Sequence, residues 1–157
     1  THNVALVFTR CILNNADYTP VGFSNPGTTS WAHQLATAYA FTSPLVVVAE
    51  HPDYLLRNAA TAPALPLIKA LPAVWDETRI LPGSSVAGRA IMARRSGDTW
   101  YLTVLNGNRA ETISVDTGFL PAGKWISCFY GSLFSICLLL FACYFFTFCL
   151  FFVPCPR

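Results

Sequence analysis

Charged residues are scarce in this sequence. Only 11% of its 157 residues are Asp, Glu, Lys or Arg, against roughly 25% in a typical soluble domain, and 54% are hydrophobic. A net charge of +2, with no cluster of Lys or Arg, gives no sign of nucleic-acid binding. A mean hydropathy of +0.45 excludes intrinsic disorder. The length leaves room for one ordinary domain or the adjoining pieces of two.

Residues that carry catalysis are also few. The 3 His and 8 carboxylates are spread thinly, and no GxSxG, HExxH, P-loop or dinucleotide-binding motif is present. Asp76 and Glu77 are neighbours, but adjacent strand residues point to opposite faces, so we expect them to lie on the surface or to support a hairpin. The sequence therefore predicts neither a catalytic residue nor a metal site in this chain.

The composition changes abruptly near Trp125. Eight of the 12 Phe and five of the 6 Cys follow Lys124, and Arg157 carries the only charge there. From Cys128 to Val153 the tail is almost wholly apolar, and as a helix it would be about 39 Å long, enough to cross a membrane. Four of its cysteines recur every six residues, which on a helix gives no common face for a metal.

Three interpretations of this tail stay open: a membrane anchor, a buried core segment, or the translation of a retained intron or shifted frame. The last fits because Phe, Cys, Leu, Ser and Tyr share pyrimidine-rich codons. At the other end, Thr1 is not an initiator and Met92 is the only methionine. We therefore expect the chain to be part of a longer protein.

Residues 1–72 show an α/β pattern. Trp31 to Phe41 places Trp31, Leu35, Ala38 and Tyr39 on one helical face, with Ser30 as a candidate N-cap. Leu45 to Val48 is a continuous aliphatic run, typical of a strand buried on both faces. Three further segments are a strand or short helix, a short extended piece and another helix: Val4 to Leu13, Asp17 to Thr19 and Pro63 to Ala70.

Residues 73–126 show an antiparallel pattern instead. Short apolar runs are divided by PGSS, SGD, NGN and PAG, and Ser96 to Asp98 reads as a hairpin loop. In the strand that follows, Trp100, Leu102 and Val104 share one face. We therefore predict a domain boundary near Leu71 to Ala73, with the apolar tail as residues 127–157.

Two acidic residues occupy positions that would lie near the active site of a barrel. Glu50 ends the predicted buried strand and Asp17 lies beside the short extended piece, positions that face the active-site mouth in a (β/α) barrel. Asp17 would bind a polar ligand or tie the loop of Thr19 and Gly22. Glu50 would do the same or cap the segment from His51 to Tyr54.

Several sequence segments resemble the C-terminal end of members of glycoside hydrolase family 97. They are FTRCILNNADYTPVGF (8–23), AHQLATAYAFTSPLVVVAEHPDYL (32–55), LPAVWDETRIL (71–81) and AIMARRSGDTWYLTVLNG (90–107). Family members are α-glucosidases and α-galactosidases with a β-sandwich, a central (β/α)8 barrel and a C-terminal all-β domain. The resemblance implies that residues 1–72 are the last barrel units and that residues 73–126 begin an antiparallel β-sandwich.

The resemblance also implies that the family's catalytic and calcium-binding residues are not in this chain. In the family, the catalytic glutamates and the calcium-binding glutamates lie upstream of the segment that matches FTR. None of them therefore maps onto this chain. Three departures stand out: Asn14, Asn15 and Ala16 replace a common Gly-Pro-Met, Val21 stands where the family often has Gly, and the family's polar strand after GKW is replaced by the apolar tail.

Three hypotheses about function follow. The first is a fragment of an enzyme that cleaves α-glycosidic bonds in oligosaccharides, inactive alone, with calcium only in the parent enzyme, which by resemblance is periplasmic or secreted. The second is a non-catalytic module in which the β domain mediates oligomerisation, held to a membrane only if the tail is genuine. The third is an inactive sugar-binding relic that uses Asp17 and Tyr18, with Glu50 as a further candidate. We also expect the isolated fragment to aggregate through its unpaired barrel strands.

Overall fold

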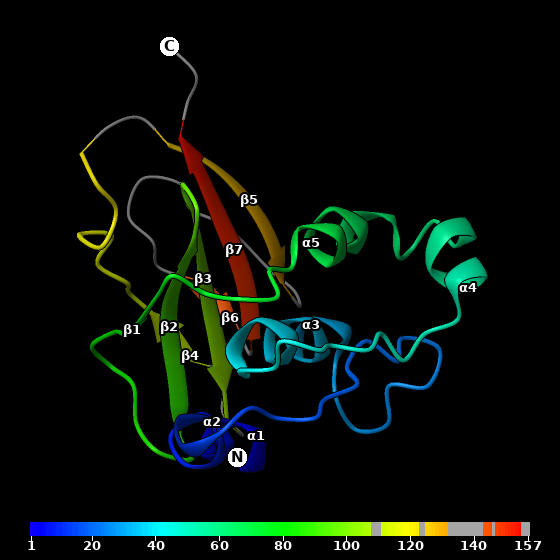
Figure 1. The fold of residues 1–157 in the computed structure, drawn as a ribbon, viewed down its shortest axis with the longest axis horizontal. Helices are drawn as coiled ribbons and strands as arrows, with labels where there is room; N and C mark the ends of the chain where they lie inside the picture. The colour runs from blue at the N-terminus through cyan, green and yellow to red at the C-terminus, as the bar shows by residue number, and fades with distance from the viewer. Residues whose placement is uncertain (108–110, 123–124, 132–142, 146, 155–157) are drawn as a thin grey trace.

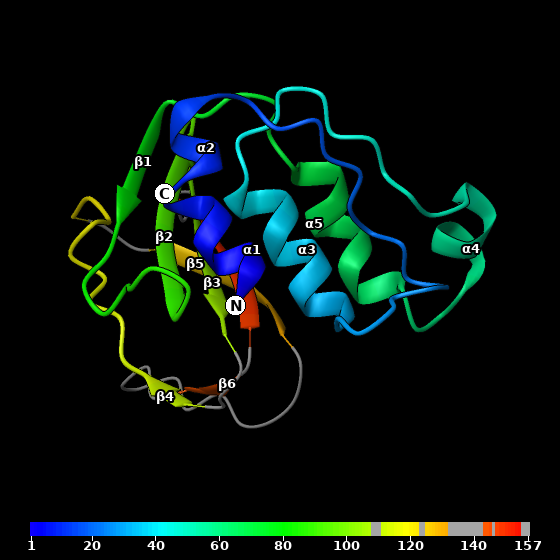
Figure 2. The ribbon, with the colours of Figure 1, turned by 90° about the horizontal axis from the view of Figure 1, so that it is seen from below.

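A computed structural model describes residues 1–107, 111–122, 125–131, 143–145 and 147–154. A twisted antiparallel sheet lies beside a layer of short helices, with the N-terminal helices under one end of the sheet (Figures 1 and 2). The helical elements are α1 (His2–Val7), α2 (Arg10–Leu13), α3 (Trp31–Ala40), α4 (Pro52–Arg57), the 3-10 helix η1 (Ala62–Ala64) and α5 (Leu65–Ala70). The strands are β1 (Glu77–Ile80), β2 (Arg89–Ser96), β3 (Thr99–Asn106), β4 (Glu111–Ile113), β5 (Trp125–Gly131), β6 (Cys143–Phe145) and β7 (Thr147–Pro154).

The helix predicted from Trp31 to Phe41 is confirmed as α3. Ser30 caps it, because its hydroxyl accepts a hydrogen bond from the His33 N–H at 3.1 Å. Leu35 and Tyr39 are fully buried, as the predicted stripe requires. The helix predicted from Pro63 to Ala70 is present as η1 followed by α5, and the ambiguous run from Val4 to Leu13 forms α1 and α2.

The antiparallel half of the prediction is also confirmed. The main sheet has the order β1-β2-β3-β7-β5, and β4 pairs with β6 in a second, two-stranded sheet. β2 and β3 form a hairpin whose loop is Gly97 and Asp98, since Ser96 pairs with Thr99. Gly97 has φ +57°, a backbone conformation that glycine adopts without steric cost and that two-residue hairpin turns need.

Both faces of the β2–β3 hairpin are buried. On one face, Trp100, Leu102 and Val104 pack with Ile91 and Phe119. On the other face the hairpin packs against helices: Met92 and Leu105 share a cluster with Val4 and Ala36, and Tyr101 lies in a cluster with Leu35 and Tyr39. The sheet and the helical layer therefore form continuous cores across the predicted boundary near Leu71.

A buried arginine joins the two layers. Arg94, on β2, is 4% exposed, and its Nη1 donates to the carbonyl oxygens of Tyr39 and Ala40 at 2.9 and 3.3 Å. Its guanidinium also lies over the Trp75 ring, 4.6 Å from the centroid. Desolvation lowers the pKa of Arg94 to about 10. A cation at the end of α3 satisfies carbonyl groups that the helix leaves unpaired and complements its dipole.

The strand predicted from Leu45 to Val48 differs from expectation. Tyr18 and Val46 form a parallel bridge, and the Ala49 N–H donates to the Pro20 carbonyl at 2.8 Å, so both segments are extended side by side. Leu45 is 74% exposed and Val47 51% exposed, so burial on both faces was wrong. Parallel strands are buried by neighbouring strands and helices, and only one extended segment pairs with Leu45–Val48 among the described residues.

The apolar tail contributes strands. β7 lies between β3 and β5, pairing Leu102 with Leu150 and Phe129 with Leu150. No helix among the described residues has the length and apolar character that a membrane crossing needs. The rest of the tail segment predicted to span a membrane lies outside the described residues.

Candidate functional site

Glu50 follows the parallel segment and is almost fully buried. Its carboxylate accepts hydrogen bonds from the Ser24 N–H at 2.5 Å, the Ser24 hydroxyl at 2.9 Å and the His51 N–H at 2.9 Å. Burial works against the charged form, but these hydrogen bonds and the nearby His51 outweigh it and lower the pKa of Glu50. The carboxylate thus holds the loop at Ser24 against the end of the Leu45–Ala49 segment.

Tyr18 points towards α3. Its hydroxyl donates to Thr37 Oγ1 at 2.6 Å, and its ring packs on Phe41 with centroids 4.7 Å apart. Burial raises the pKa of Tyr18, against the opposing effect of the Thr37 hydrogen bond. Asp17, its neighbour in sequence, is exposed. The three predicted binding residues therefore lie on adjoining segments, but they do not converge on one point.

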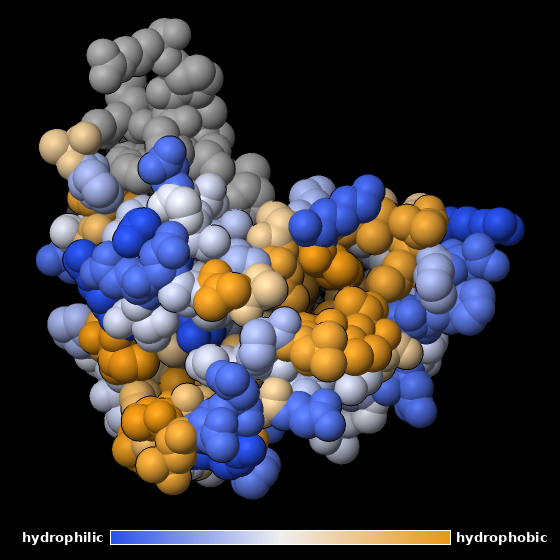
Figure 3. Space-filling model, viewed as in Figure 1, coloured by the Kyte–Doolittle hydropathy of each residue, from blue (hydrophilic) through white to orange (hydrophobic). Residues whose placement is uncertain are grey.

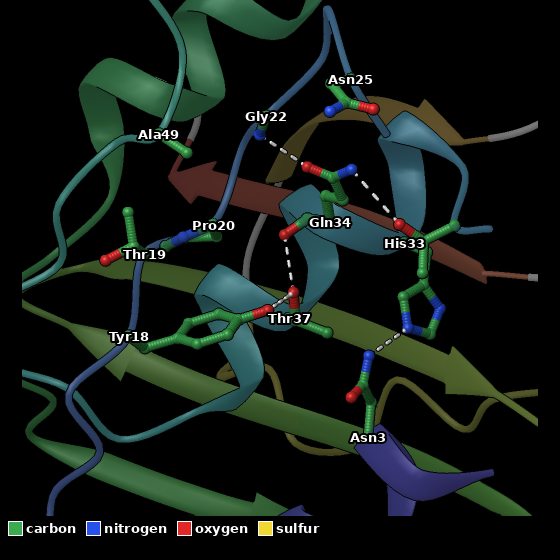
Figure 4. A pocket seen from close by; sticks show the side chains of 11 residues that line it. Asn3, Tyr18, Thr19, Pro20, Gly22, Asn25, His33, Gln34, Thr37 and Ala49 are labelled. Atoms are coloured by element: carbon green, nitrogen blue, oxygen red, sulfur yellow. Dashed lines mark hydrogen bonds between the residues drawn. The ribbon is translucent and has the colours of Figure 1, made fainter. Parts of the chain in front are cut away.

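A polar cavity of about 310 Å³ opens beside Tyr18 (Figure 4). Its lining comes from α1, the loop from Thr19 to Thr29, α3 and Ala49: Asn3, Tyr18, Thr19, Pro20, Gly22, Asn25, Thr29, His33, Gln34, Thr37 and Ala49. All of these side chains are uncharged when His33 is neutral. Asp17 and Glu50 are not among the lining residues.

Gln34 organises the loop at this cavity. Its Oε1 accepts from the Gly22 N–H at 2.6 Å, and its Nε2 donates to the Pro26 carbonyl at 3.3 Å and the Thr29 hydroxyl at 3.2 Å. Sequence reasoning missed this residue. Its position one turn before Thr37 on the predicted helix was the available signal, because residues three apart share a helical face.

His33 is a partly buried titratable group of this cavity. Its Nε2 lies 2.9 Å from Nδ2 of Asn3, and burial followed by the charge of the N-terminus lowers the pKa of His33. A neutral imidazole, amides and hydroxyls suit a neutral, polyhydroxylated ligand. The lining contains no carboxylate to act as acid, base or nucleophile.

Asp76 and Glu77, at the start of β1, both pair with arginines. Asp76 Oδ2 accepts from the Gly97 N–H at 2.8 Å and lies 3.3 Å from Arg95 Nη1, while Glu77 pairs with Arg79 and Arg95. The prediction that they support a hairpin is confirmed. Within the described part of the chain, no group of three or more His, Cys, Asp or Glu side chains is placed to hold a metal ion.

Comparison with known proteins gives a family match for part of this chain. Residues 74–130 match the family model described as Glycosyl-hydrolase 97 C-terminal, oligomerisation. This segment is a glycoside hydrolase family 97 C-terminal domain. The resemblance drawn from the sequence is confirmed, and the match begins close to the boundary predicted near Leu71 to Ala73.

Curated relatives extend the similarity upstream of residue 74. The chain is 32% identical over 132 residues to a protein of Streptomyces bingchenggensis named "Probable retaining alpha-galactosidase", covering 80% of this chain and 19% of that protein. It is 29% identical over 133 residues to the "Retaining alpha-galactosidase" of Bacteroides thetaiotaomicron, covering 76% and 19%. The chain thus spans about a fifth of the length of these relatives.

A solved structure agrees with the fold. A crystal structure titled as a beta-arabinopyranosidase matches with a TM-score of 0.55 and 32% sequence identity, over 66% of this chain and 16% of that one. The similarity covers much of the described chain, so the arrangement of helices beside an antiparallel sheet is shared with a glycosidase.

Proposed function

We propose that this chain is the non-catalytic C-terminal part of a family 97 glycoside hydrolase whose parent cleaves α-galactosidic or α-glucosidic bonds in oligosaccharides. The observation that carries the proposal is the match of residues 74–130 to the family 97 C-terminal model, supported by the similarity to two retaining α-galactosidases. The parallel pair of Tyr18 and Val46, with α3 between them in sequence, supports residues 1–72 as the last units of a (β/α)8 barrel.

Four carboxylates of the described residues make contacts that stabilise the fold. Glycoside hydrolysis needs two carboxyl groups facing each other across the scissile bond, about 5–10 Å apart. Glu50 accepts hydrogen bonds from Ser24 and His51. Asp53 forms an ion pair with Arg57, and Asp76 and Glu77 both form ion pairs with Arg95. Catalytic glutamates belong to the parent in this proposal.

We assign calcium to the parent enzyme rather than to this chain. The resemblance puts a calcium ion in the parent enzyme, but the described side chains form no cluster of three possible ligands. No step of the proposed function involves a metal held by these residues.

A chimera tests the proposal. In the Bacteroides thetaiotaomicron relative, the aligned C-terminal region would be replaced by this chain. We expect hydrolysis of nitrophenyl α-galactoside or α-glucoside by the chimera and none by this chain alone. The relative truncated at the same junction is the control.

The two arms contradict the proposal in different ways. Turnover by the isolated chain would mean that its own carboxylates are catalytic. A folded chimera without activity, beside an active unmodified relative, would mean that this chain cannot complete such an enzyme.

A second role is favoured by the description of the matching model. Because that model is an oligomerisation domain, the β-sheet part is a candidate for bringing two parent chains together. Sedimentation velocity of the full chain would test this role: a concentration-dependent dimer supports it, and a monomer at all concentrations contradicts it.

A further inference from the structure

Among the described strands, none pairs with the outer edge of β1. The sheet order places β1 at one end, and both ribbon views show it at the margin of the molecule, away from the helical layer (Figures 1 and 2). Leu81 donates its N–H to the Ile91 carbonyl at 2.8 Å, so alternation along the antiparallel ladder turns the backbone groups of Thr78 and Ile80 outwards. These outward groups can accept a further strand.

The edge carries one charge of each sign on one face. Glu77 and Arg79 are two residues apart, and Glu77 Oε1 lies 2.5 Å from Arg79 Nε with the side chains 34% and 44% exposed. The Arg79 guanidinium lies over the Trp100 ring, 5.0 Å from its centroid, which fixes its position on the sheet. Figure 3 shows this side of the sheet as mainly hydrophilic, while apolar colour gathers in a hollow among the helices.

We propose that two copies of this chain associate through antiparallel pairing of their β1 edges, with Thr78 opposite Thr78 of the partner subunit. The inference rests on the oligomerisation role proposed above and names the surface. In this register Glu77 of each copy faces Arg79 of the partner subunit, so a two-fold axis creates two complementary pairs. A two-fold axis at Arg79 would instead place like charges opposite each other, which disfavours that alternative.

Exposed apolar side chains lie within β1 and close to it in sequence. Ile80 ends β1, Val74 precedes it and Val86 lies in the loop to β2, and all three are exposed. A four-residue strand alone buries less than the roughly 1,000 Å² that a specific interface needs. Burial of these side chains by the second copy would supply additional contact area.

Charge reversal tests the pairing between copies. Glu77→Arg gives a chain with Arg at both positions, and Arg79→Glu gives a chain with Glu at both. Each full-length variant alone should dimerise about tenfold or more weakly than the unmodified chain. An equimolar mixture should form heterodimers with near-original affinity, since both cross-pairs are then complementary. Native mass spectrometry and sedimentation equilibrium measure this.

The outcomes distinguish a failure of the proposed β1 interface from a failure of the oligomerisation role. Asp53→Arg, a reversal on exposed α4, is the matched control and should leave dimerisation unchanged; melting curves establish that each variant is folded. A dimeric parent chain whose variants dimerise equally well, or fail to pair when mixed, overturns the β1 surface alone. A chain that is monomeric at all concentrations overturns the oligomerisation role as well.

Discussion

The β2–β3 hairpin and the parallel pair of Tyr18 and Val46 both contain apolar residues, yet only those of the hairpin are buried. Eight residue pairs join β2 to β3, and Leu102 is 2% exposed. The parallel pair has a single bridge, and its Leu45 is 74% exposed. The same residue type thus occupies opposite environments in the two regions.

The two regions differ in how far along the chain the partner strands lie. A hairpin brings its partner strand within two residues, so its ladder forms from adjacent sequence. Parallel strands need crossovers and neighbours on both sides, which must come from farther along a chain. In the described residues, both faces of the β2–β3 hairpin are covered by other parts of the chain, whereas the parallel pair leaves apolar side chains exposed.

Identical substitutions in the two regions give the largest expected contrast. Leu102→Ala should lower the free energy of unfolding by about 2–5 kcal/mol, because it opens a cavity among Ile91, Trp100 and Val104. Leu45→Ala is the control and should change it by less than about 0.5 kcal/mol. Urea denaturation measures both, and equal losses would contradict the contrast.

A smaller effect is expected at the end of the parallel segment. Glu50→Gln weakens the hydrogen bonds to Ser24 and His51 and should cost about 1 kcal/mol at pH 7. Because the pKa of Glu50 is lowered in the folded chain, this stabilisation is fully present above its unfolded value of 4.5 and is lost as pH falls through the folded pKa. Thermal melts of both proteins between pH 7 and pH 3 should therefore converge at low pH.

A carboxylate elsewhere provides the control for this pH effect. Asp53→Asn on exposed α4 removes only a surface pair with Arg57 and should change stability by less than about 0.5 kcal/mol. A gap between the parent chain and Glu50→Gln that persists unchanged at pH 3 would rule out the proposed linkage.

Local chemistry made part of this fold predictable. The stripe of Leu35 and Tyr39 behind Ser30 identified α3, and Ser96 to Asp98 identified the hairpin, because each signal lies within a few residues of the element it predicts. The run from Val4 to Leu13 was ambiguous, since a short apolar segment has no decisive period.

Long-range partners were beyond sequence reasoning. Four successive aliphatic residues predicted burial at Leu45–Val48, but burial depends on neighbours that the run itself does not specify. The partner of Glu50 is Ser24, 26 residues away, and nothing near Glu50 indicates it. Asp17 was expected at a site for the same reason as Glu50, yet it lies exposed; its role in sugar binding stays a prediction.

Amide hydrogen exchange tests the contrast between the two regions most directly. In the full chain, amides of β2 that face β3, such as those of Met92 and Arg94, should exchange only through global unfolding. The Val47 amide, which donates to the Tyr18 carbonyl at 3.3 Å on an exposed segment, should exchange at least about a hundredfold faster through local opening. Equal protection in the two regions would contradict the account.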